Sequence, residues 1–136
     1  LQGEMMLGST KLLPFLDGSY VSDAQEAYVD GLGNPIAAQK VEQSQVALGL
    51  DLNWTLQSGS GVLEPMAGLA AVYTDSTGTG AAALIEPAFE GWRGKLKAGV
   101  RYSTGASVFD LSTFVDGLGA PDYRDYGLTL SFSMQF

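Results

Sequence analysis

The chain has 136 residues, of which 46% are hydrophobic and 16% charged, and it contains 18 glycines but no cysteine and no histidine. The missing cysteines exclude disulfides and thiolate metal sites, and the missing histidines remove the commonest general base and metal ligand. A net charge of −8 argues against nucleic acid as a partner, because the phosphates would repel the surface.

The composition suits one β domain, or part of one, over residues 1–136, with many turns. The first residues, Leu1 to Glu4, carry neither an initiator Met nor a signal peptide, so we expect a processed or excised chain. No apolar run approaches the roughly 18 residues of a membrane helix. Clusters of Gly, Ser, Asp and Asn predict seven strands, near residues 1–7, 11–29, 36–57, 62–74, 92–103, 106–116 and 124–136.

The connections predicted between these strands alternate in length along the chain. Short ones at residues 8–10, 58–61 and 104–105 alternate with longer ones at 30–35, 75–91 and 116–123. Outer-membrane barrels have short turns at one rim and long loops at the other, so this order favours an up-and-down barrel. Within the longest connection, residues 81–91 suit a short helix, a strand extension or a loop.

The clearest interior strand is Gln45 to Gln57, in which every even position from Val46 to Leu56 is apolar. The odd positions include Asp51 and Asn53. Because side chains alternate between the faces of a strand, one face is apolar and the other polar. The apolar face predicts lipid contact, with an interfacial aromatic at one end, through Leu48, Leu50, Leu52 and Trp54.

Charged residues gather on one face of the strand that begins at Trp92. A tight turn at Thr104 and Gly105 would pair Ser103 with Ala106. It would also place Asp110 opposite Gly99, diagonal to Lys97 and Arg101. The predicted inner ladder consists of Asp51, Glu64, Lys95, Lys97, Arg101 and Asp110. Two interpretations remain open: a hydrated channel for a polypeptide segment, or an ion-pair network that only satisfies inward side chains.

The last strand, Tyr126 to Phe136, alternates over a length that suits a membrane-spanning strand. Its predicted lipid-facing residues are Leu128, Leu130, Phe132 and Met134. The terminal Phe136 is expected at the short-turn rim, either as one more interfacial aromatic or as a signal read during barrel assembly by strand addition at an edge.

Three stretches together resemble the C-terminal end of autotransporter β-domains, the translocators of type V secretion. They are residues 91–102, residues 111–119 and the ending 126–136. The resemblance implies a Gram-negative outer-membrane barrel of twelve strands, with an upstream passenger and a linker helix in the lumen. Since about seven strands are visible, the chain would be the C-terminal half of such a barrel, with the rest supplied by further sequence or by another chain.

The resulting hypothesis is a non-enzymatic translocator or anchor segment in the bacterial outer membrane. Its expected partners are outer-membrane lipid, the barrel-assembly machinery, the remaining strands and any attached passenger, but not nucleic acid. No residue pattern predicts a catalytic residue, a metal site or a cofactor. The alternatives are a small structural or pore-forming barrel built from several chains, and a soluble up-and-down barrel that binds an apolar ligand.

Overall fold

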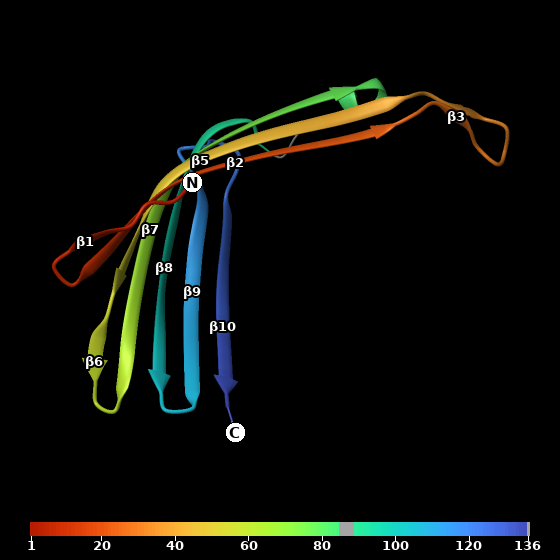
Figure 1. Ribbon diagram of the computed structural model, residues 1–136. Helices are drawn as coiled ribbons and strands as arrows, with labels where there is room; N and C mark the ends of the chain where they lie inside the picture. The colour runs from red at the N-terminus through yellow and green to blue at the C-terminus, as the bar shows by residue number, and fades with distance from the viewer. Residues whose placement is uncertain (85–88, 136) are drawn as a thin grey trace.

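The chain forms an antiparallel up-and-down sheet that curls into half of a barrel (Figure 1). The computed structural model describes residues 1–84 and 89–135. Within them the sheet has the order β1-β2-β5-β7-β8-β9-β10, and β6 also pairs with β7. The predicted all-β barrel fold is confirmed. The strands are β1 (Met5–Leu7), β2 (Thr10–Gln25), β3 (Tyr28–Val29), β4 (Pro35–Ile36), β5 (Gln39–Trp54), β6 (Leu56–Ser58), β7 (Gly61–Thr79), β8 (Gly91–Thr104), β9 (Ser107–Leu118) and β10 (Asp125–Met134).

Strand β7 is longer than its sequence suggests. The residues from Asp75 to Gly80 carry turn signals, yet β7 continues to Thr79 and pairs there with β5, Lys40 lying opposite Thr79. The prediction of a turn from Asp75 was therefore wrong, because β-branched threonines and an available partner strand outweigh local turn preference. A short 3₁₀ helix, η1 (Gly80–Leu84), follows, so the first part of the undetermined segment 81–91 is helical; residues 85–88 lie outside the described residues.

The short connections lie at one rim of the sheet. The turns at residues 8–9, 59–60 and 105–106 begin with Gly8, Gly59 and Gly105, whose φ angles of 62°, 60° and 49° are in the region that favours glycine. The predicted register of the last turn was wrong by two residues: Thr104 pairs with Ser107, because Gly105 and not Thr104 supplies the positive φ. A shift of two keeps every side chain on its predicted face.

The two faces of the sheet differ in curvature. The ammonium of Lys97 on β8 lies 2.8 Å from a carboxylate oxygen of Asp51 on β5, and 5.7 Å from the ring centre of Phe15 on β2. β7 lies between β8 and β5 in the sheet, and β5 and β7 both lie between β8 and β2. Side chains from strands that are not neighbours meet only where the surface is concave. We call this concave side the inner face. The outer face, on the convex side, carries Tyr73 and Trp92, whose rings lie 5.2 Å apart on neighbouring strands.

At the long-loop rim, β2, β5 and β7 continue beyond β8, β9 and β10 as an arm, with the β3–β4 hairpin at its tip (Figure 1). The hairpin turn is organised by Asp30, whose carboxylate accepts hydrogen bonds from the amides of Leu32 and Asn34, both at 2.8 Å. Hydrogen bonds from Asn34 lower the pKa of Asp30 below 3.8. This loop is therefore tied to an ionised side chain.

The sheet has almost no enclosed core. Among the described residues only Ala47, Val72, Ala82 and Ala120 are buried hydrophobics, and no large side chain is fully buried. The accessible surface is 9487 Å², whereas a folded 14.3 kDa monomer typically exposes about 6,800 Å². An excess this large means that the hydrophobic residues of this sheet are not covered by the chain's own packing. Among the described residues, no helix combines the length and hydropathy needed to cross a membrane.

Candidate functional site

The outer face is apolar across the whole width of the sheet below the arm. The strand registers bring even-numbered residues of β2, β5, β8 and β10 and odd-numbered residues of β7 and β9 onto this one face. It carries the predicted lipid-facing residues Leu48, Leu50, Leu52, Trp54, Leu128, Leu130, Phe132 and Met134. Many are strongly exposed, with Leu130 at 75%.

Polar side chains are rare on this face below the arm. The hydroxyl of Thr113 donates a hydrogen bond of 2.9 Å to the carbonyl of Gly127, so its polarity is satisfied within the sheet. Charged residues on the outer side, such as Glu42, occur on the arm, where Glu42 pairs with Lys40 at 2.8 Å. The outer face is thus suited to a surrounding that offers no hydrogen bonds.

Aromatic side chains border the apolar band at both ends. At the upper end, near the long loops, Tyr73 packs on Trp92. At the short-turn end, Tyr102 lies opposite Phe109, which stacks on Phe132 at 4.7 Å between ring centres. Trp92 and Tyr102 are ten positions apart on β8. With about 3.4 Å per residue and a tilt of about 40°, that distance spans about 25 Å, the height of the apolar band of outer-membrane barrels.

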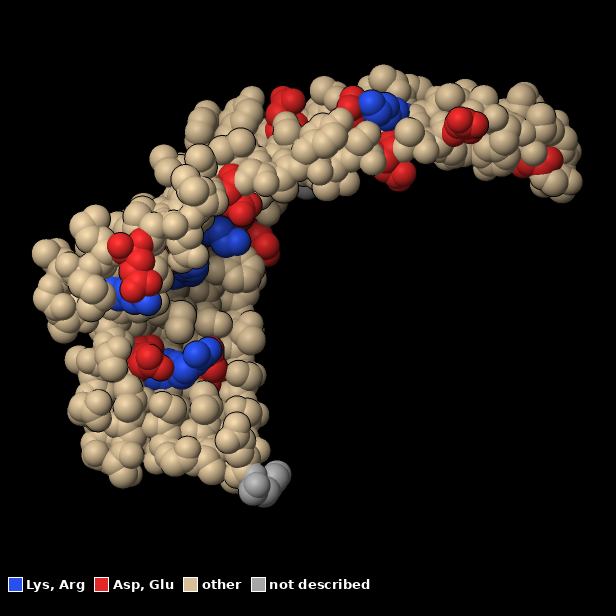
Figure 2. Space-filling model, viewed as in Figure 1, with Lys and Arg blue, Asp and Glu red and all other residues tan. Residues whose placement is uncertain are grey.

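The inner face carries the predicted charged residues, and most of them are paired. Figure 2 shows basic and acidic side chains side by side on the lower part of the sheet. Arg101 bonds to Asp110 on the next strand at 3.0 Å, and Lys97 reaches past β7 to Asp51 at 2.8 Å. Glu64 lies on β7 opposite Arg101. The structure places all the residues of the predicted ladder on the inner face, with Asp110 opposite Arg101 and not opposite Gly99.

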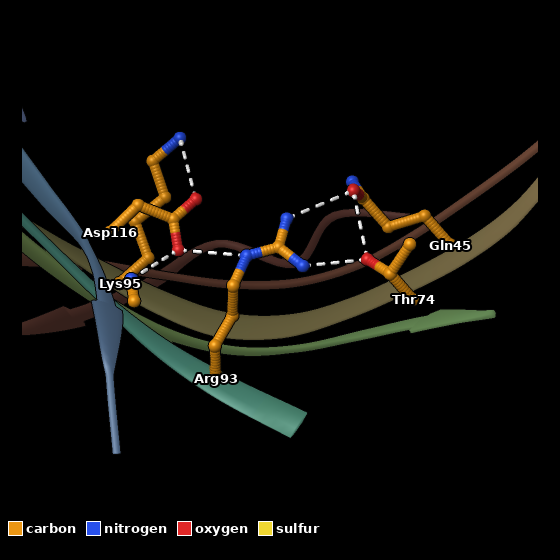
Figure 3. Close-up of polar contacts among 6 residues, drawn as sticks. Gln45, Thr74, Arg93, Lys95 and Asp116 are labelled. Carbon is orange, nitrogen blue, oxygen red and sulfur yellow. Dashed lines mark hydrogen bonds and ion pairs between the residues drawn. The ribbon is translucent and has the colours of Figure 1, made fainter. Parts of the chain in front are cut away.

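The most buried ion pair of the inner face, between Arg93 and Asp116, was not predicted from the sequence. Arg93 donates a hydrogen bond to Asp116 at 2.9 Å, to Thr74 at 2.6 Å and to Gln45 at 3.2 Å (Figure 3). The side chains of Arg93 and Asp116 are only 10% and 8% exposed. Lys95, a predicted member of the ladder, lies 4.0 Å from the same aspartate. The alternation of side chains along β8 would have been enough to place Arg93 on the inner face, since the odd-numbered residues of this strand lie there.

Arg93 also contacts two aromatic rings that lie within the long connections, before β8 and before β10. Its guanidinium lies 5.3 Å from the ring centre of Tyr123 and 5.8 Å from that of Phe89. Gly117, at a φ of 95°, forms part of a register shift in β9 and lets the backbone of Tyr123 pass close above it. Arg93 thus holds the 119–124 connection against the inner face. This contact could not be predicted from the sequence, because it depends on the geometry of the loop.

Two open hollows lie along the inner face on either side of the basic residues. One, of about 400 Å³, is lined by residues including Asp51, Asn53 and Ser112. The other, of about 370 Å³, is lined by residues including Gln45 and Asp116. Lys95 and Lys97 border both hollows, and their side chains are 40% and 48% exposed. We call the inner face with these two hollows the groove; water can enter it, and its lining mixes charged and polar side chains with apolar ones such as Phe15, Met66 and Phe114.

The groove offers hydrogen bonding and paired charge. Within residues 1–84 and 89–135, no three acidic side chains gather closely enough to hold a metal ion. Phe136, the predicted assembly signal, lies outside the described residues. Its neighbour Gln135 donates a backbone hydrogen bond of 2.9 Å to Ala106, which fixes the end of β10 at the short-turn rim.

Comparison of the chain with protein families, characterised proteins and solved structures finds no match.

Proposed function

We propose that this chain forms part of the wall of a bacterial outer-membrane β-barrel and acts, without catalysis, as a translocator or anchor segment of an autotransporter-like protein. The observation that carries this proposal is the outer face: an apolar band without charged side chains, bordered by aromatics at both ends. In water such a face would be a large exposed hydrophobic patch. In a bilayer it is the expected lipid contact.

The inner groove supports the translocator role. A polypeptide that crosses a membrane in an extended form exposes its amide groups, and these need a hydrated or hydrogen-bonding wall. The groove supplies carboxylates, ammonium groups and hydroxyls over the height of the apolar band. A segment held there, whether passing or resident, would contact Lys95 and Lys97, which border both hollows.

A barrel wall that secretes nothing is the second candidate. The charges in the groove largely neutralise one another, as in the pairs Arg101 with Asp110 and Lys97 with Asp51, and this pairing suits a purely structural lumen. The sequence encoded upstream of Leu1 separates the two roles. A long repeat-rich region would indicate a passenger, and a signal peptide directly before Leu1 would indicate a short barrel protein.

A soluble barrel with an apolar interior agrees poorly with the curvature. That alternative requires Leu48, Leu130 and their neighbours to point into the barrel, whereas the face that carries them is convex. The groove on the concave side includes charged residues such as Lys95, Lys97 and Asp51 in its lining.

Fluorescence quenching by brominated lipids tests the membrane proposal directly. The chain has two tryptophans, Trp54 and Trp92, both on the outer face and both at an edge of the apolar band. Single-tryptophan variants, Trp54→Phe and Trp92→Phe, should be quenched in vesicles more strongly by bromine near the headgroups than by bromine deep in the acyl chains.

A matched control places the reporter on the inner face. Phe114→Trp in a chain that lacks both native tryptophans should escape quenching, because its ring would face the groove. Equal quenching of inner and outer reporters would contradict the assigned faces, and a chain that stays monodisperse in water without detergent would end the membrane proposal.

A further inference from the structure

Two lysines of the groove have hydrogen-bond donors that the chain leaves unused. Within residues 1–84 and 89–135, the one carboxylate near the ammonium of Lys95 is that of Asp116, at 4.0 Å, which is too far for a hydrogen bond. Lys97 donates one hydrogen bond of 2.8 Å, to Asp51. Since an ammonium group carries three donors, most of the donors of both lysines remain available to a ligand.

The acidic partners of these lysines are less exposed than the lysines themselves. The side chains of Lys95 and Lys97 are 40% and 48% exposed, whereas those of Asp116 and Asp51 are 8% and 20% exposed. Asp116 also accepts a hydrogen bond from Arg93, which occupies it further. A molecule that enters the groove therefore meets the ammonium groups first, with the carboxylates behind them.

One exposed carboxylate opposes the lysines from the other side of the groove. Asp17 on β2 is exposed and lines the hollow of about 370 Å³ together with Lys95 and Lys97. Glu64 and Asp125 also lie on the inner face, but they line neither hollow. The lysines and Asp17 should therefore act on an acidic ligand in opposite directions, and substitutions on the two sides can measure both effects.

We propose that the groove binds an extended polypeptide segment whose acidic side chains lie against Lys95 and Lys97. This inference depends on the proposed translocator role and names the chemistry of the segment. The two lysines are two positions apart on β8, a spacing of about 6.8 Å. In an extended segment, side chains two positions apart lie on the same side with the same spacing, so two carboxylates can meet both ammonium groups at once.

Two aromatic rings lie beside the proposed contacts. The ammonium of Lys95 is 4.9 Å from the ring centre of Phe114, and that of Lys97 is 5.7 Å from the ring centre of Phe15. Both rings line the hollows that the lysines border. They shield an ion pair formed there from part of the surrounding water, which strengthens it relative to a fully exposed pair.

The test measures binding of two synthetic peptides to the full chain in detergent micelles. In one peptide threonine alternates with glutamate, and in the other threonine alternates with glutamine. Fluorescence anisotropy of a label on the peptide gives the affinity. At about 0.15 M salt the Debye length is about 8 Å, so charges elsewhere on the chain contribute little. The glutamate peptide should bind about ten-fold more tightly than the glutamine peptide, and higher salt should reduce the difference.

The decisive variant is Lys95→Gln, with Lys11→Gln as its matched control. Lys11 is also 40% exposed and also lies on the inner face, but its acidic partner Glu4 is more exposed than the lysine, at 58%. Both substitutions change the net charge equally. Lys95→Gln should weaken binding of the glutamate peptide about five-fold and leave the glutamine peptide unaffected, whereas Lys11→Gln should change neither.

A second pair of variants tests the opposite side without altering a lysine. Asp17→Asn should strengthen binding of the glutamate peptide a few-fold, because it removes the carboxylate that faces the lysines across the hollow. Asp75→Asn, on the outer side of the arm, changes the net charge equally and should have no effect. This pair keeps the proposal testable even if Lys95→Gln does not fold.

Equal affinities of the two peptides would overturn the proposal. So would equal losses in Lys95→Gln and Lys11→Gln, or equal affinities in Asp17→Asn and Asp75→Asn, since either result would reflect net charge alone. Lipid quenching of Trp54 and Trp92 reports membrane contact independently. A lipid-quenched chain that does not distinguish the peptides contradicts only the acidic segment, whereas an unquenched chain contradicts the membrane function itself.

Discussion

Arg93 is the residue whose loss should damage this sheet most through electrostatics. Arg93→Met keeps a side chain of similar length but removes the charge that faces Asp116, a residue that is 5% exposed. An aspartate left buried without its partner typically costs about 3–5 kcal/mol. The amide of Gly117, at 2.7 Å, and Lys95, at 4.0 Å, still contact Asp116, so we expect the lower end of that range.

The matched control is Arg101→Met on the same strand and the same face. The Arg101–Asp110 pair has a similar distance of 3.0 Å, but its side chains are 52% and 21% exposed. Solvent screening limits such a pair to about 0–1 kcal/mol. Urea unfolding in detergent micelles, followed by far-ultraviolet circular dichroism, should therefore separate the two variants by about 2 kcal/mol or more in unfolding free energy.

A double variant distinguishes lost charge pairing from lost packing. Arg93→Met combined with Asp116→Asn removes both charges and should recover most of the stability, because no ion is then left buried. The reasoning is refuted if Arg93→Met and Arg101→Met unfold at the same urea concentration, or if the double variant is no more stable than Arg93→Met alone.

Three further substitutions or titrations test other parts of the structure. Leu50→Arg, midway between Val46 and Trp54 on the outer face, should weaken membrane folding by about 2–4 kcal/mol, while Asn53→Arg in the groove should be mild; equal losses in vesicle refolding would contradict the faces. The amide resonance of Leu32 should shift as Asp30 protonates, with a midpoint below the ordinary range of an aspartate; because the pKa is lowered, the hydrogen bonds that order the turn are present above that midpoint and are lost as the pH falls through it. Gly49→Val should destabilise the sheet by about 1–3 kcal/mol in urea unfolding, since a Cβ there would collide with the ring of Phe15; an unchanged unfolding midpoint would mean that the ring moves freely.

The alternation of apolar and polar residues made the strands and their faces predictable. From Val46 to Trp54 and from Tyr126 to Met134 the period of two is unbroken, and a register error of two residues at the β8–β9 turn left every face assignment intact. The exact partners were less predictable. Asp110 meets Arg101 because Gly105 begins the turn, and that choice depends on a single φ angle.

Contacts that join distant strands or loops could not be read from sequence. The contacts of Arg93 were not predicted, although its odd-numbered position on β8 indicated the inner face. Its partners come from β5, β7, β9 and two connections. Local turn signals from Asp75 to Gly80 were also misleading, since pairing with β5 extends β7 through them. In both cases long-range pairing decides the structure, and periodicity carries no information about it.

Alternation alone does not say which face of a sheet is concave, but the inner face carries a second signal. Gly49, Gly68 and Gly127 all lie on that face, and a Cβ at each would collide with a large side chain from a neighbouring strand. Phe15 covers Gly49, and Phe114 covers Gly127. At Gly68 the missing side chain leaves room for the Lys97–Asp51 pair to close across β7. At these three positions the glycine thus leaves room on the concave side for a large side chain from a neighbouring strand.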